Sequence, residues 1–117
     1  MKLEVHSESR PDGTCVARLS GNLFGSPTGY AFQDEMRRRI ADGARAVVID
    51  VANVQPIDSS GVGILVALMW SASSAGTPLV LTALPQRIEK VLSMAMLLDH
   101  VDHAASVDEA LARLDKS

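Results

Sequence analysis

Apolar and polar residues alternate over the first twenty positions of the chain. Leu3 and Val5 mark one side of a first segment, and "TCVARLSG" repeats the alternation with Cys15, Ala17 and Leu19 on one face. A period of two is typical of a β-strand with one buried face. The "RPDG" between the two segments has turn chemistry, because proline presets φ and glycine accepts a positive φ. The pattern predicts a β-hairpin.

The period changes in "GNLFGSPTGYAFQDEMRRRIADG". Phe32, Met36 and Ile40 recur every four residues, which predicts a helix with one apolar face. The Ser-Pro pair at 26–27 matches an N-cap followed by the first helical residue. Gly43 is the expected C-cap.

The middle of the chain combines a strand pattern with a second, more apolar helix. "RAVVIDV" is a β-branched run typical of a strand covered on both faces, and "ANVQPI" after it predicts a loop. From Asp58 to Ala75 the spacing permits one helix, which Gly76 can end. The apolar positions expected to share a face of this helix are Val62, Leu65, Val66, Met69 and Trp70.

The last third predicts two more helices and one or two strands. "TPLVLTAL" is a strand pattern, and "MLLDHVDHA" suggests a helix end with a short edge strand near Val101. Strands that alternate with helices imply an α/β sheet that becomes parallel after the first hairpin. The helix signals are Pro85 with Ile88, Val91 and Leu92, and a capping-box pair Ser106 and Glu109 with Leu111 and Leu114.

Composition narrows the class of protein. A chain of 117 residues with 47% hydrophobic and 21% charged residues has the size and balance of one globular domain. Aromatic residues are only 3% and the net charge is −3, which argues against a nucleic-acid-binding surface. The single cysteine, Cys15, fits a buried position in a reducing cytosol. The N-terminus has no apolar h-region and the apolar run 62–70 is too short for a bilayer, so we expect a cytoplasmic protein without membrane insertion.

A polar cluster stands at the start of the most apolar segment. Asp58, Ser59, Ser60 and Gly61 precede the helix pattern directly. Asp is a preferred N-cap because its carboxylate accepts free N–H groups of the first turn. A cap needs no glycine behind it, and glycine costs about 1 kcal/mol inside a helix. Gly61 and Gly63 therefore predict close approach of another backbone or of a partner.

A serine in such a first turn has a specific physical use. Phosphorylation adds roughly −1.5 to −2 charges at neutral pH. The helix dipole and the free N–H groups tolerate an anion there, so the fold should survive the modification. The surface would still become negative and would repel a docked partner. The position therefore suits a switch that acts on binding.

These residues carry a resemblance to a known family. "VVIDVANVQPIDSSGVGILVAL" resembles the signature of the STAS domain, the family of bacterial anti-sigma factor antagonists. The resemblance continues through "LSGNL", "TPLVLTALPQRIEKVLSM" and the capped last helix. It implies one STAS domain over residues 1–117. The implied α/β fold has a four- to five-stranded mixed sheet, with an N-terminal hairpin followed by parallel strands, and about four helices mainly on one face.

The resemblance also implies a function without catalysis. Classical members bind a serine kinase that is also an anti-sigma factor, and phosphorylation of the serine after the Asp breaks this contact. By position, Ser59 is the phospho-acceptor and Ser60 the fallback, while Asp58 orients the helix start. ATP is then the kinase's substrate, and the protein itself needs no cofactor. At Phe24, in "LSGNLFG", classical antagonists usually carry an acidic residue.

The segment "KVLSMAMLLDHV" is a second candidate for partner contact. It crowds more apolar side chains together than one helix face can bury. Core filling is the default role of methionine, but an exposed share would form a binding rim. The predicted partner-binding residues are Asp58, Ser59, Ser60, Gly61, Val62, Met94 and Met96.

Other interpretations are weaker. No G-x-S-x-G elbow surrounds the serine pair, so an enzyme is not expected. His100, Asp102 and His103 are predicted to be surface residues rather than metal ligands. The run 37–39, Arg-Arg-Arg, should coat the solvent face of its helix and pair locally with the acidic residues at 34–35.

A second function class stays open at this stage. The chain fits a STAS accessory subunit, without phosphorylation, in a membrane transport assembly such as one for lipids, or in another signalling assembly. Both classes use the same helix face. The sequence does not identify the partner or the oligomeric state.

Overall fold

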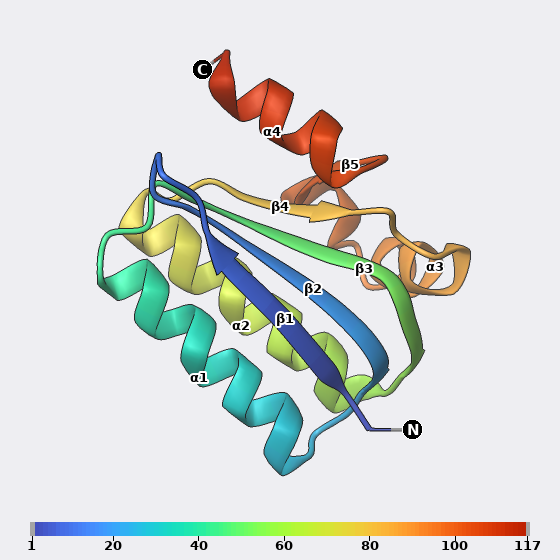
Figure 1. The fold of residues 1–117 in the computed structure, drawn as a ribbon. Helices are drawn as coiled ribbons and strands as arrows, with labels where there is room; N and C mark the ends of the chain where they lie inside the picture. Colours follow the sequence, from blue (N-terminus) through green and yellow to red (C-terminus); the bar gives the residue numbers. More distant parts are fainter. Residues whose placement is uncertain (1, 117) are drawn as a thin grey trace.

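A computed structural model describes residues 2–116 of the chain (Figure 1). It contains five strands, four α-helices and one short 3₁₀ turn, in the order that the sequence pattern predicts. Their bounds are β1 Glu4–Ser9, β2 Thr14–Leu23, α1 Pro27–Ala41, β3 Ala46–Ile57, α2 Ser59–Ala75, β4 Leu79–Thr82, α3 Gln86–Met94, η1 Leu98–His100, β5 Asp102–Ala104 and α4 Val107–Asp115.

The strands form one mixed sheet in the order β1-β2-β3-β4-β5. β1 and β2 pair antiparallel as the predicted hairpin, and Gly13 in its turn has φ +92°. β2, β3, β4 and β5 are parallel to one another. The short edge strand expected near Val101 is β5. The predicted α/β class and the mixed sheet are thus confirmed.

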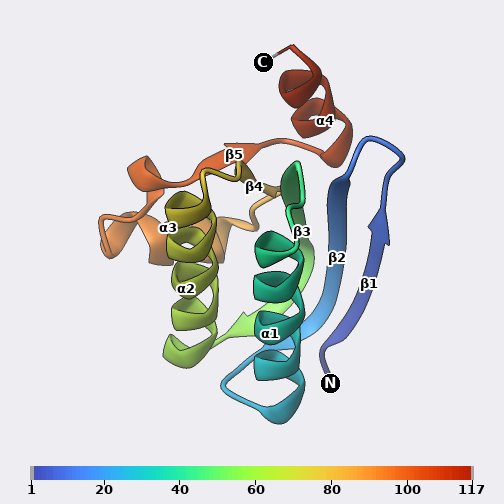
Figure 2. The same cartoon turned by 90° about the vertical axis from the view of Figure 1, so that its left-hand side faces the viewer.

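The helices lie on both faces of the sheet, three on one face and one on the other. α1 and α2 run side by side over one face, with α3 next to α2, and α4 lies apart from them (Figure 2). Alternate residues of the same strands point to opposite faces of the sheet and contribute to two separate hydrophobic cores. Val47 and Ile49 of β3 belong to the larger core with α1, α2 and α3, whereas Val48 joins Val107 and Ala110 of α4 in a smaller one.

The predicted start of α1 and both predicted ends of α2 are confirmed, whereas the predicted end of α1 shifts by one residue. Ser26 is the N-cap of α1 and accepts a hydrogen bond from the N–H of Gly29 at 3.1 Å, with Pro27 as the first helical residue. α1 ends one residue earlier than expected, at an Asp42 cap, and Gly43 follows it at φ +93°. Gly76 ends α2 in the left-handed conformation.

The prediction of a loop at "ANVQPI" is wrong, because β3 continues through these residues to Ile57. β2 also continues, as far as Leu23, and pairs with β3 along this length. The pairing shifts register twice, between Arg18 and Ser20 and between Gly21 and Leu23. Ser20 then lies opposite Asn53, and Leu23 opposite Ile57. The irregular pairing accommodates a proline, which cannot donate to a regular ladder. As a result both strands reach the start of α2.

The predicted apolar face of α2 is confirmed at Leu65, and Val62 and Met69 pack against the core, but it is wrong at Trp70. The buried residues of α2 include Ile64, Leu65 and Leu68, while Trp70 has 69% of its surface exposed. α2 contains no charged residue, so apolar spacing exists on several faces and periodicity cannot select one. Packing against the sheet and α1 makes the selection.

The arginine run of α1 does not pair as expected. Arg39 donates to the Ser9 hydroxyl at 2.7 Å and to the Ser7 hydroxyl at 3.4 Å, both on β1. Glu35 accepts from Ser7 at 3.4 Å. Within residues 2–116 no ion pair joins the run 37–39 to the acidic residues before it. The antiparallel edge strand brings hydroxyl groups within reach, which helix spacing alone could not show.

α4 begins at the capping pair that the sequence predicts. The Ser106 hydroxyl accepts from the N–H of Glu109 at 3.1 Å. The Glu109 carboxylate accepts from the N–H of Ala105 at 2.8 Å and from the Arg113 guanidinium at 2.9 Å. These bonds, with the backbone bond the largest contribution, hold the pKa of Glu109 below its ordinary value.

This lowered pKa gives a pH-dependent prediction. A carboxyl group with a depressed folded pKa stabilises the fold above its ordinary pKa, and this stability is lost as the pH falls through the folded value. We expect Glu109→Gln to lower the Tm at pH 7, and the difference from the parent protein to vanish in acid. Thermal unfolding followed by circular dichroism from pH 7 to pH 2 measures this. Asp108→Asn is the matched control, and an equal pH-dependent loss in that variant would contradict the assignment.

Candidate functional site

Asp58 begins α2 as the predicted N-cap. Its carboxylate oxygen accepts the N–H of Gly61 at 2.7 Å, and its backbone is extended at φ −108°. Its own N–H reaches the carbonyl oxygen of Leu23 at 3.4 Å. Two strand ends and one helix start are therefore joined at this residue, so the first turn of α2 has a fixed position at the carboxyl edge of the sheet.

The two glycines of this region have different roles. A Cβ on Gly61 would collide with the carbonyl oxygen of Leu23 and lie 2.9 Å from Cγ1 of Ile57. Gly61 thus lets the first turn of α2 rest on the end of β2, which is the close backbone approach that the sequence predicts. A Cβ on Gly63 would meet no heavy atom of the described chain within 4 Å. The fold itself makes no demand for glycine at position 63.

Ser59 and Ser60 are both exposed in the first turn of α2, but they face different surroundings. A Cβ on Gly25 would lie 2.6 Å from Cβ and 2.9 Å from the hydroxyl of Ser60, so Ser60 lies against the loop between β2 and α1. Ser59 shares a helix face with Gly63 and Val66, because residues three and four apart lie in line. This face points away from the core.

The loop between β2 and α1 is a part of the site that sequence reasoning did not place. Phe24 is half-buried there, and its carbonyl accepts from the N–H of Ser26 at 2.8 Å. A Cβ on Gly29 would collide with the same carbonyl, so α1 begins tightly against this loop. The signal was available in "FGSPTG", a cluster of small and turn-forming residues after a strand.

Met94 and Met96 are exposed as the rim hypothesis requires, with 75% and 81% of their surface accessible. Met96 lines a surface groove of about 400 Å³ between α2 and the segment after α3, together with Trp70 and Leu97. Trp70 is eleven residues after Ser59, which is roughly 16 Å along a helix. The predicted set therefore divides: five residues lie at the start of α2 and Met96 lies in a separate apolar groove near the end of that helix, whereas Met94 does not line this groove.

A further hollow lies beside the start of α2. It has a volume of about 290 Å³ and is lined by the end of β3, residues 54–57, and the start of α3, residues 85–88. Arg87 contributes the one charged side chain of this lining. Ligands of open α/β sheets commonly bind at the carboxyl ends of strands, which is where this hollow lies.

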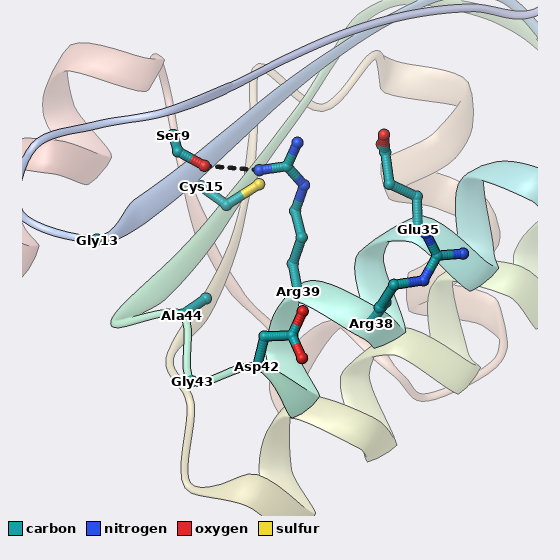
Figure 3. A pocket seen from close by; sticks show the side chains of 9 residues that line it. All are labelled: Ser9, Gly13, Cys15, Glu35, Arg38, Arg39, Asp42, Gly43 and Ala44. Atoms are coloured by element: carbon teal, nitrogen blue, oxygen red, sulfur yellow. Dashed lines mark hydrogen bonds between the residues drawn. The ribbon is translucent and has the colours of Figure 1, made fainter.

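Another surface hollow lies at the other end of β2, beside the turn of the hairpin. It has a volume of about 500 Å³, and Ser9, Cys15, Arg38, Arg39 and Asp42 contribute to its lining (Figure 3). Cys15 is buried, and this burial raises the pKa of its thiol, so it is a poor nucleophile at neutral pH. Both signs of charge line the hollow. It is not continuous with the serine pair.

The histidines near the C-terminus do not form a cluster. His100 and His103 are exposed, and they border different surface hollows. In residues 2–116 no three His, Cys, Asp or Glu side chains gather closely enough to hold a metal ion. None of the helices in this part of the chain is long and apolar enough to cross a bilayer.

The fold and the capped serine pair together define a class of α/β domain, in which a mixed sheet carries a polar helix start at the carboxyl edge of its parallel strands. The family model of the STAS domain matches residues 8–110. The chain belongs to the STAS domain family.

Solved structures share this fold. A Thermotoga maritima protein assigned as an anti-sigma factor antagonist has a TM-score of 0.85 at 20% identity, over 95% of this chain and 94% of that one. The Bacillus cell fate determinant SpoIIAA in its phosphorylated form has a TM-score of 0.77 at 22% identity, over 95% and 99%. A sulfate transporter family protein from Wolinella succinogenes has a TM-score of 0.74 at 19% identity, over 91% and 88%. At these identities the likeness establishes the fold.

Proposed function

We propose that the chain, as a single STAS domain, is an anti-sigma factor antagonist that binds a serine kinase/anti-sigma factor and is controlled by phosphorylation of Ser59. The observation that carries this proposal is the exposed Ser59 hydroxyl in the first turn of an Asp58-capped helix. A kinase can reach this hydroxyl without unfolding the chain. One fold relative is known in a phosphorylated form, which supports the same chemistry here.

The position of Ser59 suits a binding switch for electrostatic reasons. A phosphate there would lie near the positive end of the α2 dipole and near N–H groups of the first turn, so the fold tolerates it. A partner docked over Asp58, Ser59 and Val62 would instead meet a new dianion. ATP enters as the substrate of the kinase, and no catalytic step is assigned to this chain.

The test is intact-mass and peptide mass spectrometry on the protein isolated from its native cells. One phosphate is expected at Ser59, absent in Ser59→Ala and retained in Ser60→Ala. Phosphate on Ser60 alone would transfer the role to the fallback residue, which faces the loop at Gly25. The absence of phosphate under every growth condition would contradict the switch.

A charge-placement experiment checks the physical basis of the switch. Ser59→Glu should leave the circular dichroism spectrum unchanged and raise the free energy of unfolding by about 0.5 kcal/mol, because an anion at a helix N-terminus is favourable. Ser74→Glu, exposed in the last turn of α2, should lower it by a similar amount. Urea unfolding measures both. A large loss of stability in Ser59→Glu would mean that the fold does not tolerate an anion there.

A second candidate is a STAS accessory subunit of a membrane transport assembly, without phosphorylation. The fold likeness to a sulfate transporter family protein favours it. Both functions use the exposed start of α2, with the Met94 and Met96 rim as a further contact. Recovery of unmodified protein with membrane transport components would support this candidate, and loss of that recovery in Met96→Lys would place the contact at the rim.

A further inference from the structure

The outer face of α2 is unusual for a surface helix. Ser59, Gly63, Val66, Trp70 and Ser73 follow one another at spacings of four, three, four and three, so they form one stripe opposite the buried Leu68 side. The whole of α2 is free of charged residues, whereas a solvent-facing helix surface normally carries them. We name these five residues the outer stripe.

Trp70 is the most prominent side chain of the outer stripe. It is 69% exposed, and with Val66, Met69, Met96 and Leu97 it borders the groove of about 400 Å³ beside α2. Single exposed apolar residues are ordinary on proteins, but tryptophan and methionine that converge on one groove are typical of an interface. Tryptophan is also among the residues that contribute most to association.

Gly63, two turns earlier on the same stripe, leaves a gap in the surface where Trp70 forms a projection. The space over it is open, because a Cβ there would meet nothing within 4 Å in the described part of the chain. Glycine inside a helix lowers stability relative to alanine. The fold gives no reason for this glycine. A second surface that approaches position 63 closely would give one.

The outer stripe is complementary in shape to the outer stripe of a second copy that runs in the opposite direction. A two-fold axis near Val66 places position 70 of one copy opposite position 63 of the other, and position 73 opposite position 59. We propose that this chain forms a two-fold homodimer through antiparallel α2 helices, in which Trp70 of each copy covers Gly63 of the other. In such an isologous contact every residue pair occurs twice. The pair of Trp70 and Gly63 therefore forms two equivalent contacts across the interface.

Charge and size indicate what kind of dimer this is. Each chain carries a net charge of −3, but the outer stripe is neutral, so two copies can meet here without placing like charges together. Antiparallel helices also place the positive end of one dipole beside the negative end of the other. A 17-residue helix is about 25 Å long and 10 Å across, which gives a contact well below the roughly 800 Å² per partner of stable complexes. The dimer is therefore weak, with a Kd of roughly 0.1 mM.

The geometry links self-association to Ser59. In the dimer Ser59 lies beside Ser73 and the negative end of the other α2 dipole, where a negative charge is unfavourable. Ser59→Glu should therefore weaken the dimer several-fold. The serine kinase and a second copy of the chain would therefore compete for the outer stripe. This competition rests on the proposed function, whereas the dimer itself does not.

Trp70 is the only tryptophan in the chain and reports directly on the contact. Sedimentation equilibrium and tryptophan emission would be measured on the full chain from 5 µM to 1 mM. We expect a rise in mass toward that of two chains, with a parallel blue shift of the emission maximum as Trp70 leaves water. A single-chain mass and a constant emission maximum over this range would overturn the proposal.

Two variants separate this dimer from association through another face. Trp70→Ala and Gly63→Gln should each weaken self-association at least tenfold, and circular dichroism should show both folded because both positions are exposed. Tyr30→Ala, at an exposed aromatic residue of α1, is the matched control and should leave the mass unchanged. A dimer that survives both stripe variants would overturn the proposal. A monomer whose Trp70→Ala variant loses a co-purified kinase would also overturn it and assign the outer stripe to that protein.

Discussion

Gly61→Ala should lower the free energy of unfolding by about 3 kcal/mol, which is a large effect for one methyl group. The added Cβ would collide with the carbonyl oxygen of Leu23, a backbone atom at the end of β2 that cannot rotate away, and it would press on Ile57. Relief requires α2 to move away from the sheet, and this would also disturb the hydrogen bond between Asp58 and the N–H of residue 61.

Gly63→Ala is the matched control, two residues along the same helix. Position 63 is exposed and open, so alanine should raise the free energy of unfolding by about 0.5 kcal/mol through its better helix propensity. Urea unfolding of the two variants, followed by circular dichroism, gives both values. Equal effects at 61 and 63 would contradict the placement of α2 against Leu23.

The second large effect is expected at Leu68. Its side chain is fully buried in the core between α2 and the sheet, and Leu68→Ala should lower the free energy of unfolding by about 3 kcal/mol through lost burial and a residual cavity. Trp70→Ala, two residues further on, should cost less than about 1 kcal/mol at low protein concentration because Trp70 is mostly exposed.

This pair of variants decides which face of α2 is buried. Helical spacing alone assigns Trp70 to the core, and in that case its truncation would cost about 3–5 kcal/mol, as is typical of buried tryptophans. The measurement is again urea unfolding, at concentrations of a few micromolar so that self-association does not contribute. A larger loss at Trp70 than at Leu68 would reverse the assignment.

The serine pair shows how a motif and a structure contribute differently to one site. The sequence places Ser59 and Ser60 side by side, with nothing to separate their chemistry except the family resemblance. In the structure they face different neighbours: Ser60 lies against Gly25 of the loop before α1, and Ser59 lies on the outer stripe. A kinase that approaches along α2 would meet Ser59 first. The choice of Ser59 as phospho-acceptor stays a prediction.

Local signals were sufficient where the cause is local. The turn at "RPDG", the Ser26 and Ser106 caps and the left-handed Gly76 follow from residue chemistry over three or four positions. The same holds for the Asp58 cap. The family signature is local as well, because it lies within one strand, one turn and one helix start.

The tertiary structure decided what depends on contacts between distant segments. β3 extends through Pro56 because the end of β2 continues beside it, with Leu23 paired to Ile57. Arg39 bonds to hydroxyl groups of β1 because the hairpin edge passes over α1. The sequence of α2 has no charged residue on any side and apolar residues on several faces, so only its packing against the sheet and α1 determines that Leu68 is buried and Trp70 exposed. The sequence by itself thus determined the order of elements and the polar helix start, while the tertiary structure decided which surface of that helix a partner can reach.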